Sequence, residues 1–340
     1  MALNDFLRNA SSGMRRFFKG CYKLLYMKPV IAYKTLGCPA INEFRIHPDF
    51  KYSTKSYYPA ILMNDEKKAK KIYSRVVDFD SNGIPMYRGF EQRYWPVTIT
   101  QCALLNYNLY LSSDCGDKYK KRVISICDWL VDNIDEKTGA WLCNINYHCT
   151  VADEDMNPPF CSAMVQGQAI SALVRAFYLT KNNRYLECAG HALQPLVTPV
   201  KEGGAYREFA GLAFYEEYPT KKPSMVLNGF IYTLFGLYDL GSCNCKDSVA
   251  ASKMFDAGYS TLVKLIPLYD GGFCSRYSLS HITVFPNYNS NPLYHPIHVN
   301  QLIAINSIRK SPVLEYYIKE WKQRRTTAST CTASPSGVSR

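Results

Sequence analysis

The stretch that decides the fold is FYEEYPTKKPSMVLNGFIYTLFGLYDL, residues 214–240. It places Glu216 and Glu217 between two tyrosines, and Pro219 follows the second tyrosine directly. A Lys-Lys-Pro turn follows, and the apolar residues after it recur with helical spacing, which predicts a helix over Ser224–Leu240. Acid/base groups at the mouth of an apolar helix indicate a functional site more than a packed core, so we expect the other helices to be arranged around it.

Outward from this stretch, apolar residues recur at threes and fours in further segments. The predicted helices are Val97–Ser112, Tyr119–Ile134, Ser162–Thr180, Asn183–Leu196, Ser224–Leu240, Lys246–Ile266, His295–Ile308 and Pro312–Gln323. Consecutive helices form pairs with a short link between the two members. Long Gly- and aromatic-rich connectors separate one pair from the next: Gly139–Phe160, Gly203–Pro219 and Gly271–Leu293. Four helical hairpins with long connectors on one side predict a mainly α fold, an α/α toroid (an incomplete barrel) with small β-hairpin connectors at the mouth of a funnel.

The expected domain organisation has four parts. They are a basic amphipathic segment at 1–34, a small extended and β-rich region at 35–92, the α/α-barrel catalytic domain at 93–325 and a Ser/Thr-rich disordered tail at 326–340. In the second part, Asp78–Gly83 imitates the first half of a calcium-binding EF-hand loop. Its twelfth position is Gly89 instead of the bidentate Glu that such a loop requires, so a turn is predicted there.

Composition narrows the class of partner. The net charge of +12 favours a polyanion, and no nucleic-acid-binding module is present, which leaves an acidic polysaccharide or glycan or an anionic membrane surface. The segment 1–34 either makes such a peripheral membrane contact or packs its aromatic residues on the domain. The 13 scattered cysteines indicate reduced thiols. Without a secretory signal or a long apolar span, the expected location is cytoplasmic, with homodimerisation left open.

Four groups of polar residues carry the candidate chemistry. They are Glu216-Glu217-Tyr218, Arg276–His281, Tyr294–Gln301 and Gln166-Gly167-Gln168, and the first three lie on long connectors or at the helix starts that follow them. His295 and His298 share a helix face, so a metal site with Glu217 as third ligand is an alternative. A His-x-x-His pair without a following Glu is a weak zinc signal, and we expect no metal.

From about Arg93 to Arg325 the chain resembles the C-terminal catalytic domain of D-glucuronyl C5-epimerases, which invert glucuronic acid to iduronic acid within heparan-type chains. The motifs that carry the resemblance are Ser162–Ser171 (SAMVQGQAIS), Tyr215–Thr220 (YEEYPT), Val226–Phe230 (VLNGF), Gly236–Leu240 (GLYDL), His298–Leu302 (HVNQL) and Ser311–Val313 (SPV). The resemblance implies an α/α barrel of four helical hairpins, which agrees with the fold predicted from the helical pattern.

The resemblance also implies roles for single residues. The second Glu and second Tyr of the YEEYP motif are functional in the family, which makes Glu217 and Tyr218 catalytic, and two further motif tyrosines correspond to Tyr277 and Tyr294. Ser278 and Ser280 depart from the family, which has Asp and Arg there. The expected substrate-binding residues are Tyr94, Gln101, Gln168, Arg207, Asn228, Arg276, His295, His298 and Asn300, with Arg207 or Arg276 in place of the missing arginine.

The implied reaction removes a proton alpha to a carboxylate and returns one to the opposite face of the ring, without a cofactor. It requires an acid or base on both faces, so either tyrosines with a lowered pKa or a carboxylate with a raised pKa would serve. We expect Glu217, with Tyr218, to act on one face and Tyr294 on the other, while Tyr277 orients the sugar or shares proton transfer. A uronate polysaccharide lyase and a non-catalytic acidic-glycan-binding protein are the alternatives. A glycoside hydrolase fits less well, since adjacent glutamates point to different sides of an extended segment.

Overall fold

The computed structural model describes residues 46, 49–59, 77–89, 93–113, 116–272, 274–284 and 294–330, with side chains described up to position 323. These residues lie in one compact unit, Ala40–Arg340. The predicted N-terminal segment 1–34 falls outside the described residues, as do the last ten residues of the predicted tail. Among the described residues, no helix combines the length and the apolar character needed to cross a membrane.

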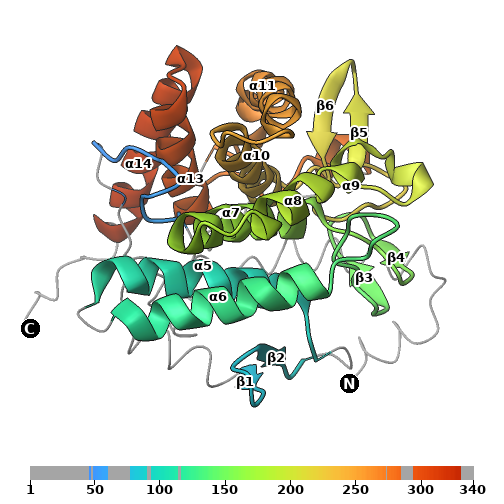
Figure 1. Cartoon of the computed structure of the whole chain (residues 1–340). Coiled ribbons are helices and arrows are strands. Elements are labelled where there is room, and N and C mark those ends of the chain that lie inside the picture. The colour runs from blue at the N-terminus through green and yellow to red at the C-terminus, as the bar shows by residue number, and fades with distance from the viewer. Residues whose placement is uncertain are drawn as a thin grey trace, which may run out of the picture. The chain divides into compact units, whose positions relative to one another are not determined.

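The described part of the chain is mainly helical (Figure 1). Its helices are α5 (Pro96–Ser112), α6 (Gly116–Asp132), α7 (Ala163–Thr180), α8 (Arg184–His191), α9 (Gln194–Val197), α10 (Leu227–Gly241), α11 (Ser248–Leu265), α12 (Ser280–Thr283), α13 (His295–Ile308) and α14 (Pro312–Thr330). Its strands form three antiparallel hairpins: β1 (Val77–Phe79) with β2 (Pro85–Tyr87), β3 (Tyr147–Cys149) with β4 (Glu154–Met156), and β5 (Tyr206–Phe209) with β6 (Leu212–Tyr215).

The long helices pack in sequential pairs, α5 with α6, α7 with α8, α10 with α11, and α13 with α14. The first helices of the pairs also contact one another, because α7 packs between α5 and α10, and α10 packs on α13 (Figure 1). Helices α7 and α10 are buried on nearly all sides, whereas α6 buries one face only. The first helices therefore form an inner layer, and most of the core lies around α7 and α10.

The predicted helices are confirmed, with three changes at their ends. Residues 224–226 lie outside the helix, because the Glu216 carboxylate holds the Ser224 hydroxyl and the Met225 backbone N–H, and Met225 takes a φ of +49°. The helix predicted over Asn183–Leu196 is broken into α8 and α9, the second of which has Pro195 in its first turn. Helix α14 runs on to Thr330, so the predicted disordered tail begins within a helix.

The β1–β2 hairpin confirms the turn predicted in place of a calcium loop. The Asp80 carboxylate accepts the backbone N–H groups of Asn82 and Ile84, at 2.9 and 2.8 Å. Gly83 takes a φ of +80°, which a residue with a side chain rarely adopts. Asp80 thus stabilises a tight turn.

Two glycines let the backbones of α7 and α10 touch. A Cβ added to Gly167 would lie 2.4 Å from the Thr233 Cα, and one added to Gly236 would lie 2.3 Å from the Gly167 carbonyl oxygen. The neighbouring atoms belong to the backbone and cannot rotate away. Gly167 therefore allows the close approach of another helix.

Replacing Gly167 by Ala is expected to lower the free energy of unfolding by about 3 kcal/mol, because the two helices must separate to accept the methyl group. Chemical denaturation measures this loss. Gly116→Ala is the control, since its Cβ would meet atoms no nearer than 3.4 Å, and it should change stability by about 1 kcal/mol or less. Equal effects of the two substitutions would contradict the close crossing.

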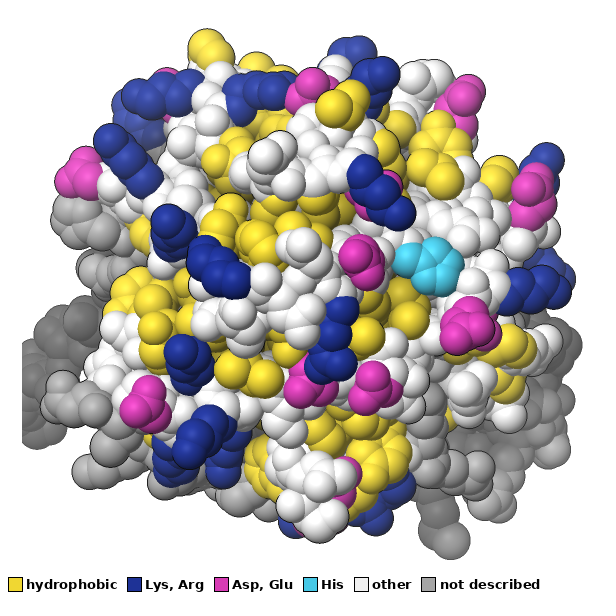
Figure 2. Space-filling model, in the orientation of Figure 1, with side chains coloured by type: hydrophobic (Ala, Val, Ile, Leu, Met, Phe, Trp, Pro, Cys, Tyr) yellow, Lys and Arg dark blue, Asp and Glu magenta, His cyan; other side chains and the backbone are white. Residues whose placement is uncertain are grey.

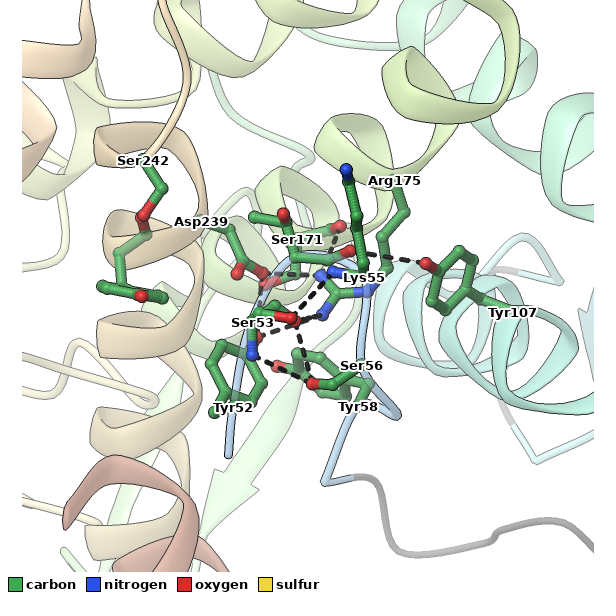
Figure 3. A network of polar contacts seen from close by, with 12 residues as sticks. Tyr52, Ser53, Lys55, Ser56, Tyr58, Tyr107, Ser171, Arg175, Asp239 and Ser242 are labelled. Atoms are coloured by element: carbon green, nitrogen blue, oxygen red, sulfur yellow. Dashed lines mark hydrogen bonds and ion pairs between the residues drawn. The ribbon is translucent and has the colours of Figure 1, made fainter. Parts of the chain in front are cut away.

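A buried ion pair joins α7 to α10 at the ends of these helices away from Ser162 and Val226 (Figure 3). Arg175 Nη1 donates to Asp239 Oδ2 at 2.6 Å, and the Tyr52 hydroxyl donates to the same oxygen at 2.9 Å. The guanidinium also lies 5.2 Å from the ring centroids of Tyr58 and Tyr107. Through these contacts the segment 49–59 is fixed against the inner helices.

Candidate active site

The two glutamates of the opening stretch lie in different environments. Glu216 is fully buried, accepts a hydrogen bond from Arg207 Nε at 2.8 Å, and also binds Ser224 and Met225. Arg207 Nη2 and Nη1 donate to the carbonyl oxygens of Thr220 and Lys221 respectively. Glu216 and Arg207 thus hold the connector after β6 in place, and Arg207, a predicted substrate-binding residue, has its guanidinium engaged there.

Glu217 lies against the first turn of α10. It is 4% exposed, and a Cβ at Gly229 would come within 2.3 Å of Oε2, so only glycine leaves room for this carboxylate. The Tyr277 hydroxyl donates to Oε1 at 3.4 Å, whereas Oε2 has no hydrogen-bond partner among the described residues. Burial raises the pKa of Glu217 to about 7, and hydrogen bonds from Tyr218 and Tyr277 oppose this rise.

The structure brings the four predicted catalytic residues into one cluster. Tyr277 connects them, because its hydroxyl reaches Glu217 and its ring lies 4.5 Å from the ring of Tyr294, at 56°. Its own backbone is fixed to the start of α10, since its carbonyl oxygen accepts the Leu227 N–H at 2.9 Å. Tyr294 is the residue before α13, and Tyr218 follows Glu217 directly. Two connectors that are distant in the sequence therefore converge on one carboxylate.

The tyrosine hydroxyls of this cluster are weaker acids than an exposed tyrosine. Burial, reinforced by the nearby Glu217 charge, raises the pKa of Tyr294 to about 12 and raises the pKa of Tyr218 and Tyr277 well above 10. Of the two arrangements considered from the sequence, the structure contains the buried carboxylate with a raised pKa and not tyrosines with a lowered pKa. The phenols are protonated at neutral pH and are suited to donate.

His295 and His298 are both buried at the start of α13, and both contact Ser275. His295 Nδ1 accepts the Ser275 backbone N–H at 2.9 Å, and Nε2 lies 3.0 Å from the Trp321 carbonyl oxygen. Both ring nitrogens are thus engaged, which leaves none to bind the metal ion considered from the sequence. Burial lowers the pKa of His298 to about 3, so this imidazole is neutral, and its Nε2 has no described partner.

The starts of α10 and α13 hold further buried polar atoms without a described partner. They are Asn228 Oδ1 and Gln301 Oε1, in addition to Glu217 Oε2 and His298 Nε2. Asn228 and Gln301 are neighbours, since Gln301 Nε2 donates to the Asn228 carbonyl oxygen at 3.0 Å. Each buried polar atom left without a hydrogen bond costs about 1–3 kcal/mol. Such a concentration is typical of a site that binds a ligand rich in hydrogen-bonding groups.

The other predicted substrate-binding residues have different surroundings. Gln168 is buried and accepts a hydrogen bond from the Thr100 hydroxyl at 3.1 Å, and Tyr94 contacts Asp80 and Trp129. Gln101, Arg276 and Asn300 are half-buried, on α5, on the segment before α12 and on α13 respectively. None of the contacts described for Tyr94 or Gln168 reaches the Glu217 cluster.

Tyr147 belongs to this cluster and was missed from the sequence. Its ring stacks on Tyr218, with centroids 5.4 Å apart and planes at 10°. It lies at the start of β3, on the long connector before α7, where the sequence predicted only a small β-hairpin. The proximity of Tyr147 and Tyr218, far apart along the chain, could not be read from spacing.

The chain matches the family model of the D-glucuronyl C5-epimerase C-terminus over residues 135–323. It is 35% identical over 217 residues to the D-glucuronyl C5-epimerase of Caenorhabditis elegans, a match that covers 60% of this chain and 35% of that protein. It is also 24% identical over 223 residues to an uncharacterized protein of Methanocaldococcus jannaschii, with 61% and 68% covered. The chain thus spans about a third of the curated epimerase that it matches.

Proposed function

The chain belongs to the D-glucuronyl C5-epimerase family, and from this membership we propose that it inverts C5 of D-glucuronate to L-iduronate within a glucuronate-containing polysaccharide or glycan. The observation that supports the proposal most is the position of Glu217, a buried carboxylate with a pKa of about 7 that Tyr277 connects to Tyr294. A base whose pKa lies near the working pH is both deprotonated and strong enough to remove a proton.

In the proposed mechanism the Glu217 carboxylate removes the C5 proton of glucuronate. The C5–H bond breaks, and its electron pair becomes part of an enolate shared with the substrate carboxylate. The Tyr294 phenol then donates its proton to C5 from the opposite face, which forms the new C–H bond and completes the inversion. This division of roles agrees with the protonation states, because Glu217 ionises near pH 7 whereas the pKa of Tyr294 is about 12.

Tyr277 would restore the starting protonation states of Glu217 and Tyr294 after each turnover. Inversion leaves a proton on Glu217 and a negative charge on Tyr294. The Tyr277 hydroxyl lies 3.4 Å from Glu217 Oε1, and its ring packs on Tyr294, so it is placed to pass the proton from one group to the other. The reverse reaction uses the same groups with their roles exchanged.

The developing enolate also needs hydrogen-bond donors or a cation. Ser278 and Ser280 are buried and lie beside each other, with 2.9 Å between their hydroxyl oxygens, and they bring no charge. The half-buried Arg276 and the neutral His298 are the candidates that we propose for the substrate carboxylate. Arg207 is a weaker candidate, since it is paired with Glu216.

The remaining predictions extend the proposal to the whole chain. We propose that the four helical pairs build an incomplete α/α toroid and that an acidic glycan reaches its mouth from the connector side. Figure 2 shows Lys and Arg interspersed with Asp and Glu on one face, so this face offers no continuous basic stripe to a polyanion. The cytoplasmic location, peripheral membrane contact through 1–34 and a homodimer remain predictions.

The decisive experiment is incubation of the protein with an unsulfated glucuronate polymer in deuterated water. An epimerase introduces deuterium at C5 and leaves the chain intact. A lyase produces an unsaturated end that absorbs ultraviolet light, and a hydrolase produces a new reducing end. Binding without any deuterium uptake would overturn the proposal in favour of the non-catalytic glycan-binding alternative.

Replacing Tyr294 by Phe is expected to lower deuterium exchange at C5 by about 100-fold, because the ring remains and the proton donor is lost. The control is Tyr316→Phe on α14, where the tyrosine is 56% exposed, and it should leave exchange unchanged. Both variants should unfold at the temperature of the unmodified protein. Unchanged exchange in the Tyr294 variant would exclude Tyr294 as the donor.

A further inference from the structure

Ser275 joins the two buried histidines at the start of α13. Ser275 and His298 are 0% exposed, and His295 is 5% exposed. The Ser275 Oγ lies 2.7 Å from His298 Nδ1 and 3.0 Å from His295 Nδ1. A serine hydroxyl has a single proton to donate. The direction of these two contacts therefore decides which nitrogen of each imidazole carries its proton.

The proton of His295 is fixed by two partners that have only one possible role each. The backbone N–H of Ser275 can only donate, and it lies 2.9 Å from His295 Nδ1, so this nitrogen carries no proton. The carbonyl oxygen of Trp321 can only accept, and it lies 3.0 Å from His295 Nε2. His295 is therefore a neutral ring with its proton on Nε2.

The proton of His298 follows from that of His295. The lone pair of His295 Nδ1 already accepts the Ser275 N–H, whereas His298 Nδ1 lies closer to the hydroxyl and accepts from no other described residue. The hydroxyl therefore donates to His298 Nδ1. Burial lowers the pKa of His298 to about 3, so the ring is neutral and its one proton lies on Nε2. No described residue accepts that proton.

His298 lies beside the catalytic cluster. Its ring centroid is 6.3 Å from that of Tyr294 and 6.5 Å from that of Trp321. The other buried atoms without a described partner at the starts of α10 and α13 are oxygens of Glu217, Asn228 and Gln301. An N–H group among these oxygens can stabilise negative charge that develops on a substrate. Because Nε2 already holds a proton, His298 does not compete with Glu217 for the C5 proton.

The segment that carries Ser275 also carries Tyr277, and two backbone hydrogen bonds fix it. The Arg276 N–H donates to the Tyr269 carbonyl oxygen at 2.7 Å, and the Tyr277 carbonyl oxygen accepts the Leu227 N–H at 2.9 Å. The Ser275 hydroxyl is therefore held at a constant position relative to the Tyr277 phenol. His298 is oriented by the same segment that brings Tyr277 to Glu217.

We propose that Ser275 and His295 are positioning residues that hold His298 as a neutral hydrogen-bond donor, with its proton on Nε2, for the uronate carboxylate as it becomes an enolate. The proposal rests on the proposed epimerase function. Ser275 and His295 act through the orientation and the tautomer of His298, and they take no part in proton transfer.

Nuclear magnetic resonance of the full chain labelled with ¹⁵N-histidine tests the tautomer directly. The chain has six histidines, and the His298→Gln variant identifies the signals of His298 by their loss. At pH 7 we expect the proton of His298 on Nε2, and addition of an unsulfated glucuronate polymer should shift this Nε2 signal. A proton on Nδ1, or an Nε2 signal that the polymer does not change, would overturn the proposal.

Replacing Ser275 by Ala is expected to lower kcat for deuterium exchange about 10-fold through loss of one hydrogen bond to His298. KM should stay unchanged, because the oriented donor acts on charge that develops only in the transition state. Ser242→Ala, which removes an exposed hydroxyl at the end of α10, is the control and should leave kcat unchanged. An unchanged kcat in the Ser275 variant would contradict the positioning role.

Two replacements of His298 separate the donor from the bulk of the ring. His298→Leu removes the N–H and should lower kcat about 100-fold. His298→Gln keeps an N–H donor at the end of the side chain and should recover about 10-fold of this loss. Thermal unfolding would show that both variants are folded. If the Gln variant were no more active than the Leu variant, His298 would act through packing alone.

Failure of the proposed function is distinguishable from failure of this inference. If the unmodified protein exchanges no deuterium, the epimerase proposal fails, and the role inferred for His298 fails with it. If the protein exchanges deuterium but His298 carries its proton on Nδ1, only the inference fails. The tautomer is measured on the protein without substrate, so this result does not depend on activity.

Discussion

Replacing Glu217 by Gln is expected to lower deuterium exchange at C5 by about 10⁴-fold and to raise the stability of the protein at pH 8. The loss of activity follows because the amide cannot accept the C5 proton, and a positioned base contributes up to about that factor. The gain in stability follows because the fold holds this carboxylate at 4% exposure, where its charge is unfavourable. One substitution should thus move activity and stability in opposite directions.

The pH dependence gives the sign of the stability effect. Burial raises the pKa of Glu217 from its ordinary 4.5 to about 7, so between these values the folded protein binds the proton more tightly than the unfolded chain does. Stability is therefore lost as pH rises from about 4.5 to 7 and stays low above pH 7. The free energy of unfolding falls by about 3 kcal/mol in total. The Glu217→Gln variant should not show this fall.

Chemical denaturation at pH 5 and pH 8 measures this difference. The unmodified protein should lose more stability between the two values than the Glu217→Gln variant. Glu208→Gln on β5 is the matched control, because that glutamate is exposed, and it should change neither stability nor exchange. Exchange by the unmodified protein should rise with pH up to about 7, and a flat profile from pH 5 to 8 would exclude Glu217 as the base.

Replacing Arg175 by Ala is expected to lower the free energy of unfolding by about 3–5 kcal/mol. Arg175 and Asp239 are both 0% exposed, and removal of the guanidinium leaves the Asp239 carboxylate in the core without its cation. The Tyr52 hydroxyl would remain as a described donor to Asp239, and one neutral hydrogen bond does not replace an ionic partner. Denaturant titration at neutral pH measures the loss.

Two controls separate the buried pair from ion pairs in general. Arg184→Ala removes a pair with Asp128 in which both side chains are more than a third exposed, and it should cost about 1 kcal/mol or less. The double variant Arg175→Met with Asp239→Leu removes both charges and should be more stable than Arg175→Ala alone. If the double variant were no more stable than Arg175→Ala, the unpaired carboxylate would not be the cause of the loss.

The helices were predictable from the sequence because each buries a periodic apolar face, as in Ala169, Leu173 and Ala176 of α7. The break before Pro195 was not predicted, since apolar spacing continues across it. Arg175 was also not anticipated as a core residue, because the sequence does not show that Asp239 lies opposite it. The spacing of apolar residues along the chain predicts helices. The pairing of buried charges depends on how helices that are distant in the sequence pack together.

The candidate site was predictable where it rests on short motifs and unpredictable where it rests on tertiary contacts. Glu217, Tyr218, Tyr277 and Tyr294 were expected together, and the structure places them in one cluster. The engagement of Arg207 by Glu216 could not be foreseen, since it depends on the register of the β5–β6 hairpin. Tyr147 was missed for the same reason, because its partner Tyr218 belongs to a different connector.

The glycine contact between α7 and α10 restricts how the helices behind Glu217 can move. Because Gly167 and Gly236 bring two backbones together, the helices behind Glu217 cannot move apart without breaking that contact. Any rearrangement around the proposed active site must then come from the connectors that carry Glu217 and Tyr277. Efforts to change the substrate preference of the proposed enzyme should therefore alter connector residues and keep the inner helices unchanged.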